Sequence, residues 1–461
     1  MCCVMGYTGH DLSAEKFKEY LLRTVDRGPD DQRVVEGPYG LMGFGRLAIM
    51  GLTPEGMQPF YRGADCVVCN GELYGFRFEK EILKRRGYKF CSDCDCEILL
   101  PLYYEYGLDM FRHMDAEFAL ILYDSRKDRL IAARDPIGIR PLFYGYSKSS
   151  HKIAFSSEMR NLIGWCDDIR PFPIGSYYCD GRFVRYEDIA DVPAPMQDDM
   201  DTVLRNIREK LIAGVEKRLD ADAPVGFLLS GGLDSSLISA VCAKKMEQAG
   251  RQLMTFSVGY PENDKYFRAG KFQPTSDSDF IGLMEEFLHS DHHLTELPPE
   301  TLVSSLEEAT VARDLPGMAD VDFSLLAFCR EIRKYVKVAL SGECADEIFG
   351  GYPWYRDPEV RDRAGFPWAQ NTIDRCNLLH PDLRAKLDGE AYVMEAYLKT
   401  CRESDVLPGC SPRERRMKEM VNLNFRWFMQ TLLDRKDRMS MFSGLEVRVL
   451  PWKIISLKTT F

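Results

Sequence analysis

Short apolar runs alternate with polar turns through the first 155 residues of the chain. Runs of this kind predict strands at 117–123, 129–133, 141–146 and 152–155. Two other stretches, 78–86 and 97–106, have the pattern of helices, and a glycine follows each of them closely. This mixture of strands and helices predicts a layered α+β domain.

The second half of the chain has a different pattern. Apolar residues at every fourth position from 203 to 219 predict an amphipathic helix. Apolar runs at 224–229, 254–259 and 336–340 then predict buried strands of a parallel sheet. The run at 237–243 predicts a buried helix behind the first of these strands. We therefore expect an α/β fold in this half.

A proline-rich, acidic segment separates the two patterns at 191–200, DVPAPMQDDM. Such a composition is typical of a linker between domains. The sequence thus predicts one domain at 1–190, a linker at 191–200 and a second domain at 201–461. Each domain is long enough to bury its own core.

Composition narrows the class of protein. The chain has 461 residues, 45% apolar and 28% charged, as is ordinary for a globular protein. The net charge is −11 and no lysine-arginine block occurs, which argues against a nucleic-acid partner. No stretch approaches the roughly 20 apolar residues of a membrane span, and we expect no signal peptide. The cysteine count, 15, is odd and favours reduced thiols, hence a cytoplasmic protein.

A glycine- and serine-rich loop follows the predicted strand 224–229. Its sequence at 230–236 is SGGLDSS, and the predicted helix comes directly after it. A glycine turn between a strand and a helix exposes backbone N–H groups that bind anions, and serine hydroxyls add donors. Asp234 would repel phosphates unless a divalent cation lay between them. The loop therefore predicts a magnesium-nucleotide site, although a helix cap without a ligand is the alternative.

A second loop of this kind follows the predicted strand 336–340, with the sequence SGECADEIFGGY at 341–352. Loops at the carboxyl ends of parallel strands lie together, where ligands collect. Asp346 could then share a magnesium ion with Asp234 across the phosphates. Acids that complement a helix dipole are the alternative explanation of Glu343, Asp346 and Glu347.

Cys2 is a candidate nucleophile. If Met1 is removed, Cys2 carries a free α-amine with a pKa of about 7.7–8.0, close to that of a thiol at roughly 8.5. One residue would then hold both a nucleophile and its base. Taken alone, a cysteine at position 2 carries little weight.

Further motifs give Cys2 a context. They stand in this order along the first half: RTVDRGPD at 23–30, GRLAI at 45–49, GMQPF at 56–60, NGELY at 70–74, SDCDCE at 92–97 and ARDPIGIRPL at 133–142. The series resembles the glutaminase domain of class II amidotransferases, and SGGLDSS is similar to the pyrophosphate loop of ATP pyrophosphatases. Together, over nearly the whole chain, they resemble the glutamine-dependent asparagine synthetase family.

The resemblance implies a fold and a reaction. The fold would be an N-terminal-nucleophile αββα sandwich followed by a parallel-sheet ATP-pyrophosphatase domain. Glutamine would be hydrolysed in the first domain, and ammonia would pass through an interior channel to the second. There ATP with Mg²⁺ would convert aspartate to its β-aspartyl-AMP ester, and ammonia would displace AMP to give asparagine. A homodimer is a further expectation.

The resemblance also assigns residues. Cys2 would attack the glutamine amide, with Asn70 and Gly71 as the oxyanion hole. The alternative for Asn70-Gly71 is a hairpin turn. Glutamine would be bound by the residues Arg46, Asn70, Glu72 and Asp95. ATP would be bound by Leu229, Ser230, Gly231, Gly232, Asp234, Ser235, Ser236, Val258, Ser341 and Gly342. Magnesium would be held by Asp234 and Asp346, and the acceptor and pyrophosphate would lie near Glu343 and Asp346.

Four features depart from the family or compete with it. The family has glycine after the nucleophile, whereas Cys3 here could crowd Cys2 or oxidise with it. The cysteine pairs 66/69 and 91/94, with Cys96, come close to a zinc-ribbon spacing, although Cys66 and Cys69 would lie on opposite faces of a strand. The acceptor region 313–324 differs from the best-known members, which leaves aspartate open as acceptor.

The fourth departure is the tail. Residues 433–435 and 439–449 match the family, but the sequence from Leu450 onward does not. We therefore expect a C-terminally incomplete synthetase domain. Two alternatives stay open: a glutaminase with a defective ATP-binding half, and a non-catalytic product that only binds partners.

Overall fold

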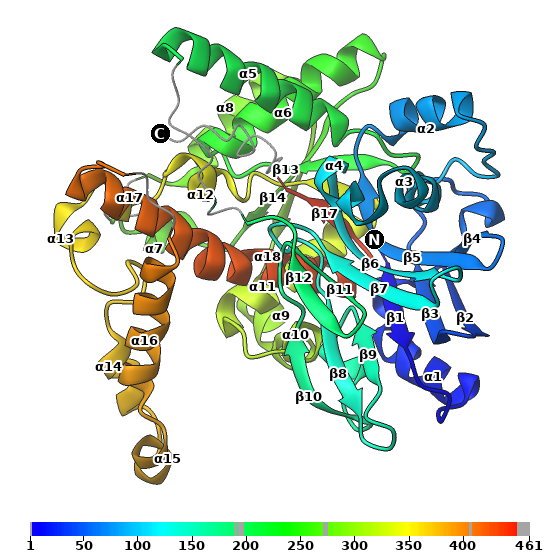
Figure 1. Ribbon diagram of the computed structural model, residues 1–461. Coiled ribbons are helices and arrows are strands. Elements are labelled where there is room, and N and C mark those ends of the chain that lie inside the picture. The colour runs from blue at the N-terminus through cyan, green and yellow to red at the C-terminus, as the bar shows by residue number, and fades with distance from the viewer. Residues whose placement is uncertain (1, 189–190, 192–197, 271–274, 405–407, 450–461) are drawn as a thin grey trace.

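A computed structural model describes residues 2–188, 191, 198–270, 275–404 and 408–449 (Figure 1). Most of the predicted linker, 192–197, and the tail from Leu450 onward lie outside the described residues. The first half folds around two antiparallel six-stranded sheets, and the second around a parallel five-stranded sheet. In the described part, no helix has the length and apolar character needed to cross a membrane.

The two antiparallel sheets lie face to face. The first has the order β10-β8-β9-β1-β3-β2, with the bounds β1 Cys3–Tyr7, β2 Asp31–Gly37, β3 Gly40–Arg46, β8 Phe143–Ser147, β9 Ile153–Ser156 and β10 Cys166–Pro171. The second has the order β12-β11-β7-β6-β5-β4, with the bounds β4 Phe60–Arg62, β5 Asp65–Leu73, β6 Ala116–Asp124, β7 Arg129–Arg134, β11 Ser176–Cys179 and β12 Arg182–Arg185.

Strand alternation explains the layers. On β1, Val4 packs in the core between the sheets with Met42 and Ile121. Its neighbours Cys3 and Met5 face the opposite way, against helix α1 (Ala14–Leu21). Helices α2 (Phe76–Arg85), α3 (Leu99–Tyr106) and α4 (Met110–His113) cover the outer face of the second sheet. The predicted αββα sandwich is confirmed.

The parallel sheet of the second half has the order β15-β14-β13-β16-β17. Its strands are β13 Val225–Leu228, β14 Met254–Gly259, β15 Asp291–Glu296, β16 Val338–Leu340 and β17 Glu446–Arg448. Helices α5 (Met200–Lys217) and α6 (Leu233–Gln248) pack on one face, and α11 (Ala319–Arg333) packs on the other. Strands buried on both faces explain the continuous apolar runs in the sequence, and the predicted α/β fold is confirmed.

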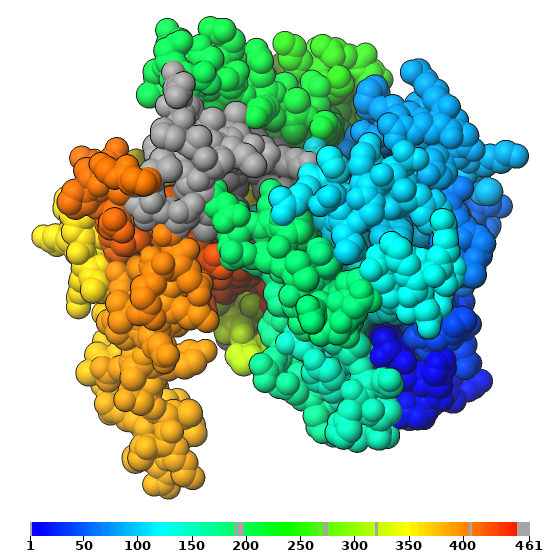
Figure 2. All heavy atoms as spheres, in the orientation of Figure 1, coloured from blue at the N-terminus to red at the C-terminus, as the bar shows by residue number. Residues whose placement is uncertain are grey.

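The remaining helices surround this sheet or extend from it. Their bounds are α7 Asn263–Tyr266, α8 Asp277–Leu288, α9 Pro299–Ser304, α10 Leu306–Arg313, α12 Ala345–Phe349, α13 Pro358–Arg361, α14 Thr372–Asn377, α15 Pro381–Lys386, α16 Gly389–Arg402, α17 Pro412–Leu423 and α18 Met429–Phe442. Helices α14 to α16 project from the body as an arm (Figures 1 and 2). Helix α18 instead runs into the interface between the two halves, where it contacts α10 and α11.

Asn70 and Gly71 lie inside strand β5 and do not form a hairpin turn. Gly71 pairs with Phe118 of β6. A Cβ at Gly71 would lie 2.4 Å from the backbone oxygen of Glu117. The glycine is therefore required because β6 approaches closely, and the turn alternative for this dipeptide is wrong.

Candidate functional site

A small cavity lies where β1, β3 and β5 meet the turn that precedes α3. Its wall includes five of the six residues predicted to act on glutamine, Cys2, Arg46, Gly71, Glu72 and Asp95. The sixth, Asn70, is fully buried and hydrogen-bonded to Cys2. Residues from four separate motifs therefore meet at one site.

Cys2 and Asn70 are in direct contact. The backbone N–H of Cys2 donates to Asn70 Oδ1 at 2.9 Å. Asn70 Nδ2 is buried and has no acceptor among the described residues. A buried donor without a partner is costly, and an oxyanion formed beside Cys2 would satisfy it. Burial raises the pKa of the Cys2 thiol to about 11, so a base must take its proton before it can attack at neutral pH.

Arg46 stands at the end of β3 with its guanidinium fixed by a neighbouring loop. Its Nη1 donates to the carbonyl of Thr53 at 3.0 Å, and its Nη2 donates to the carbonyl of Gly51 at 2.5 Å. Both acceptors are neutral carbonyls, so they orient the guanidinium and do not neutralise its charge. A carboxylate in the cavity would complement that charge.

Glu72 and Asp95 supply negative charge to the same cavity. Burial raises the pKa of Glu72, Asp95 adds to this rise, and the guanidinium of Arg448 opposes it. Burial also raises the pKa of Asp95, against a hydrogen bond of 2.8 Å from the N–H of Leu73. Both carboxylates therefore gain from a cation in the cavity, such as an ammonium group.

Cys3 does not crowd Cys2. Because residues alternate along β1, the Cys3 side chain lies on the other face, where its sulfur is 3.1 Å from the hydroxyl of Thr24. Cys3 packs with Phe17 and Met5, whereas Cys2 packs in the core between the sheets. The expected interference between the two thiols is wrong for this geometric reason.

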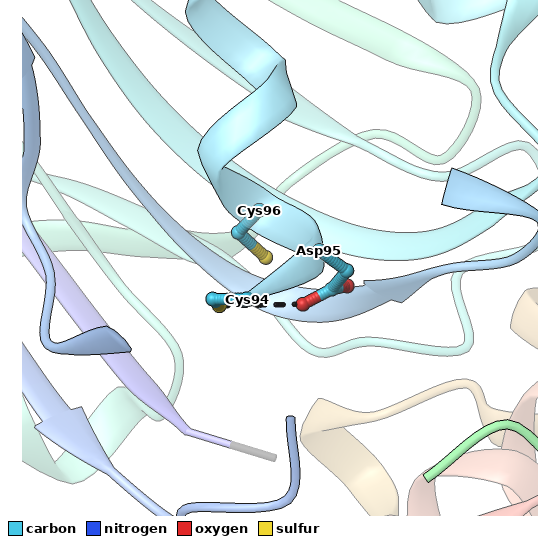
Figure 3. Close-up of side chains that lie close together, drawn as sticks. All are labelled: Cys94, Asp95 and Cys96. Atoms are coloured by element: carbon cyan, nitrogen blue, oxygen red, sulfur yellow. Dashed lines mark hydrogen bonds between the residues drawn. The ribbon is translucent and has the colours of Figure 1, made fainter. Parts of the chain in front are cut away.

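The zinc-ribbon spacing is not assembled. Cys66 faces the core between the sheets and Cys69 faces the helices, as expected for residues on opposite faces of β5. Cys91 is exposed. A different group does come together, because Cys94 and Cys96 flank Asp95 in the wall of the cavity (Figure 3).

A second cavity, of about 390 Å³, opens at the carboxyl ends of β13 and β16. These strands are neighbours in the parallel sheet. Eight of the ten residues predicted to bind ATP line it: Leu229, Ser230, Gly232, Asp234, Ser235, Val258, Ser341 and Gly342. Asp346, predicted to hold magnesium, lines it as well. Glu343 of the predicted acceptor region lines it too. The remaining two, Gly231 and Ser236, lie in the same loop outside its wall.

The first loop is shaped by its glycines and serines. Gly231 has φ +75°, a conformation that favours glycine. The Ser235 hydroxyl lies 3.0 Å from that of Ser230 and closes the turn. A Cβ at Gly342, in the second loop, would lie 3.0 Å from the N of Ser235. The two loops therefore touch, which the sequence indicated only through the order of the strands.

Carboxylates face one another across this cavity. Burial, with the nearby charge of Asp346, raises the pKa of Asp234 to about 6. Burial also raises the pKa of Glu347 to about 7. Oxygen ligands of this kind suit Mg²⁺, and a divalent cation would relieve the repulsion between Asp234 and Asp346. The donor set therefore fits the predicted metal.

Lys436 is a residue of this cavity that sequence reasoning missed. It is buried on α18, lines the cavity, and places its Nζ 3.2 Å from Oε1 of Glu343. Arg435 shares the same carboxylate oxygen at 3.2 Å. The only signal was position, because Lys436 directly follows the family-like LDR at 433–435.

The interface between the halves contains buried ion pairs that no motif indicated. Arg27 Nη1 lies 2.6 Å from Asp437 and 3.0 Å from Glu158. Arg438 lies 3.1 Å from Glu158, and Arg448 lies 3.2 Å from Glu72. Burial alone would raise the pKa of Glu158, but the two arginines lower it overall. Charge pairing across the interface thus joins α18 and β17 to the first half, and one of these pairs reaches Glu72 in the wall of the first cavity.

Part of the region 313–324 is also at this interface. Arg313 is buried against Asp322 and Asp434. Asp314 accepts hydrogen bonds from the backbone N–H groups of Met159 and Arg160, at 2.6 and 2.9 Å. These contacts hold the segment to the first half.

Comparison with known proteins agrees with this architecture. A family model described as asparagine synthase matches residues 206–450, and one described as a glutamine amidotransferase domain matches residues 1–186. A glutamine-hydrolysing asparagine synthetase of Bacillus subtilis (strain 168) is 37% identical, over 97% of this chain and 79% of that protein. A probable glutamine-hydrolysing asparagine synthetase of Schizosaccharomyces pombe is 32% identical, over 86% of this chain and 73% of that protein.

Proposed function

Because the chain belongs to the glutamine-hydrolysing asparagine synthetase family, we propose that it makes asparagine from aspartate, glutamine and ATP. The observation that carries this proposal is the pair of cavities. One gathers a cysteine nucleophile with charges of both signs, and the other gathers the glycine-serine loop with carboxylates. We propose that the first cavity belongs to a domain at 1–190 and the second cavity to a domain at 201–461.

Glutamine hydrolysis begins at Cys2. After removal of Met1, the free α-amine takes the thiol proton, and the thiolate attacks the side-chain amide carbon of glutamine. Asn70 Nδ2 and the N–H of Gly71 stabilise the oxyanion. Arg46 pairs with the α-carboxylate of glutamine, and Glu72 and Asp95 pair with its α-ammonium. The α-ammonium of Cys2 then gives its proton to the leaving nitrogen, and collapse of the intermediate releases ammonia and leaves a thioester. Water cleaves the thioester to give glutamate and restores the thiol.

The second cavity activates the acceptor. The β-carboxylate of aspartate attacks the α-phosphorus of ATP, and pyrophosphate leaves. Backbone N–H groups and hydroxyls of the loop 230–236 bind phosphate oxygens, while Leu229 and Val258 lie against the nucleoside. Asp234 and Asp346 would hold Mg²⁺, which screens the phosphate charge. Ammonia from the first cavity then displaces AMP, and a dry passage between the cavities keeps it unprotonated.

The test uses the full chain and two variants. We expect the parent to form asparagine and pyrophosphate with either glutamine or ammonia. Cys2→Ala should lose glutamine-dependent but retain ammonia-dependent synthesis. Asp234→Asn should lose both while still hydrolysing glutamine. Synthesis from glutamine by Cys2→Ala would overturn the proposal. Glutamate release without pyrophosphate in the parent would instead identify a glutaminase with a defective ATP-binding half.

Two finer statements complete the proposal. We place the reaction in the cytoplasm, because the Cys2 thiol must stay reduced to act as the nucleophile. We also propose a homodimer. Sedimentation of the full chain over a range of concentrations decides the oligomeric state, and a monomer at every concentration would contradict a dimer.

A further inference from the structure

A group of thiols lies beside the proposed nucleophile without a part in the reaction. Cys94 and Cys96 flank Asp95 at the start of the turn Asp95–Ile98, and the three residues are buried. One ligand atom from each lies within 4.8 Å of the other two (Figure 3). The Cys69 thiol, on β5, interacts with that of Cys96. Two sulfurs and one carboxylate thus meet in one place, and a third sulfur, that of Cys69, lies beside Cys96.

The spacing of these atoms is close to that of a tetrahedral metal site. With Zn–S bonds of about 2.3 Å and Zn–O bonds of about 2.1 Å, tetrahedral ligands stand about 3.6 Å apart for S···O and about 3.8 Å apart for S···S. The Cys94 sulfur lies 3.4 Å from Oδ1 of Asp95. The ligand atoms of Cys94, Asp95 and Cys96 lie within 4.8 Å of one another, so these three residues need shifts of about 1 Å or less.

An ion could also reach this group. Cys69, Cys94, Asp95 and Cys96 all line the cavity that contains Cys2. The charge of Arg448 also acts on Asp95 and would offset part of the negative charge that thiolates bring to the site.

We propose that Cys69, Cys94, Asp95 and Cys96 bind a thiophilic divalent cation of the Zn²⁺ class, and that the bound ion inhibits glutamine hydrolysis. On binding, the thiols release their protons to the solvent and form metal–sulfur bonds. No electrons are transferred. The inhibition rests on the proposed function, because it follows from the loss of Asp95 as a partner of the glutamine ammonium.

Cobalt(II) tests the site without any assay of activity. Thiolate ligands in a tetrahedral site give Co²⁺ a sulfur-to-metal charge-transfer band and intense visible bands, which oxygen ligands do not give. With excess Mg²⁺ present to occupy carboxylate sites, we expect one such Co²⁺ per chain. Cys94→Ser and Cys69→Ala each remove one of the three proposed thiolates, so the sulfur-to-metal band should weaken in both. Cys91→Ser, at an exposed neighbouring thiol, should keep the bands of the parent, as should Cys2→Ala.

Inhibition gives the second measurement. We expect Zn²⁺ to inhibit glutamine-dependent synthesis by the parent and to leave ammonia-dependent synthesis unchanged. The Zn²⁺ concentration that half-inhibits Cys94→Ser should be at least roughly tenfold higher than the concentration that half-inhibits the parent. Thermal melting shows whether each variant is folded.

The outcomes separate the proposals. Unchanged cobalt bands in both folded variants, or no bands in the parent, would overturn the site. Equal zinc sensitivity of the parent and Cys94→Ser would show that zinc acts at Cys2 alone and would overturn the inhibition. A parent that binds Co²⁺ but never hydrolyses glutamine would leave the metal site standing and refute the proposed function.

Discussion

The guanidinium of Arg448 lies 3.2 Å from the carboxylate of Glu72, and this ion pair joins the last strand of the parallel sheet to the wall of the cavity that contains Cys2. Both side chains are buried. Arg448 also donates to the backbone carbonyls of Arg218 and Asp220, each at 2.8 Å. A residue of the synthetase half therefore controls a charge in the glutaminase half.

Replacing Arg448 with methionine should impair glutamine binding. Without the guanidinium, burial raises the pKa of Glu72 further, and a protonated Glu72 binds ammonium poorly. We expect a higher KM for glutamine and an unfolding free energy lower by about 3–5 kcal/mol, as when one partner of a buried pair is removed. Steady-state kinetics and denaturant unfolding measure both. Arg448→Lys should restore part of each, and an unchanged KM in Arg448→Met would contradict the coupling.

Asn70→Asp isolates the proposed oxyanion donor. The substitution keeps an oxygen for the N–H of Cys2 but removes Nδ2, and it adds negative charge where the oxyanion forms. We expect kcat for glutamine hydrolysis to fall by about 10²–10³-fold. Ammonia-dependent asparagine synthesis is the internal control and should be unaffected. A loss of both activities would mean that Asn70 supports the fold and not the oxyanion.

Lys436→Met should impair the ATP-dependent half alone. Loss of a charge-assisted contact of about 1.5–3 kcal/mol corresponds to a fall of roughly 10–100-fold in pyrophosphate release. Glutamine hydrolysis should not change. Arg435→Met is the matched control, because Arg435 shares the contact with Glu343 but does not line the cavity. Equal losses of pyrophosphate release in the two variants would mean that Lys436 only positions Glu343 and does not itself contact the substrate.

Stability of the metal-free protein should depend on pH through Asp234. Its folded-state pKa of about 6 lies above its ordinary value of 3.8. The folded state therefore binds more protons than the unfolded state between these values, and Asp234 lowers stability as pH rises from about 4 to 6. Asp234→Asn should raise Tm at pH 7 and give no advantage near pH 4.

Thermal melts of the parent and the variant across this range, without magnesium, measure the effect. Asp109→Asn is the control, since Asp109 is exposed and makes no capping hydrogen bond. A Tm difference between the parent and Asp234→Asn that does not vary with pH would contradict the assigned shift.

Much of the fold could be predicted because local pattern decides it. The apolar runs of β6 and β13 are each explained by the faces they bury, and motif order brought together distant residues such as Cys2 and Asn70. Side chains alternate between the two faces of a strand, and this explains the direction of Cys3 once β1 is known. The sequence pattern did not show where that strand begins.

Other features lay beyond sequence reasoning because they depend on contacts between distant elements. Arg27 meets Asp437, 410 positions further along the chain, and a buried arginine looks like any surface arginine in a sequence. Lys436 had no motif of its own. The thiols of Cys69 and Cys96 come from different elements, so the spacing of cysteines suggested the wrong set.

The pairing of Glu72 with β17 has a consequence for protein synthesis. Arg448 is among the last of the described residues to be synthesised. A nascent chain whose first half is already complete therefore still lacks the arginine that pairs with Glu72. Such a half-made chain would bind glutamine poorly. Under the proposed function, glutamine would thereby be protected from hydrolysis by chains that do not yet have an acceptor site for the ammonia.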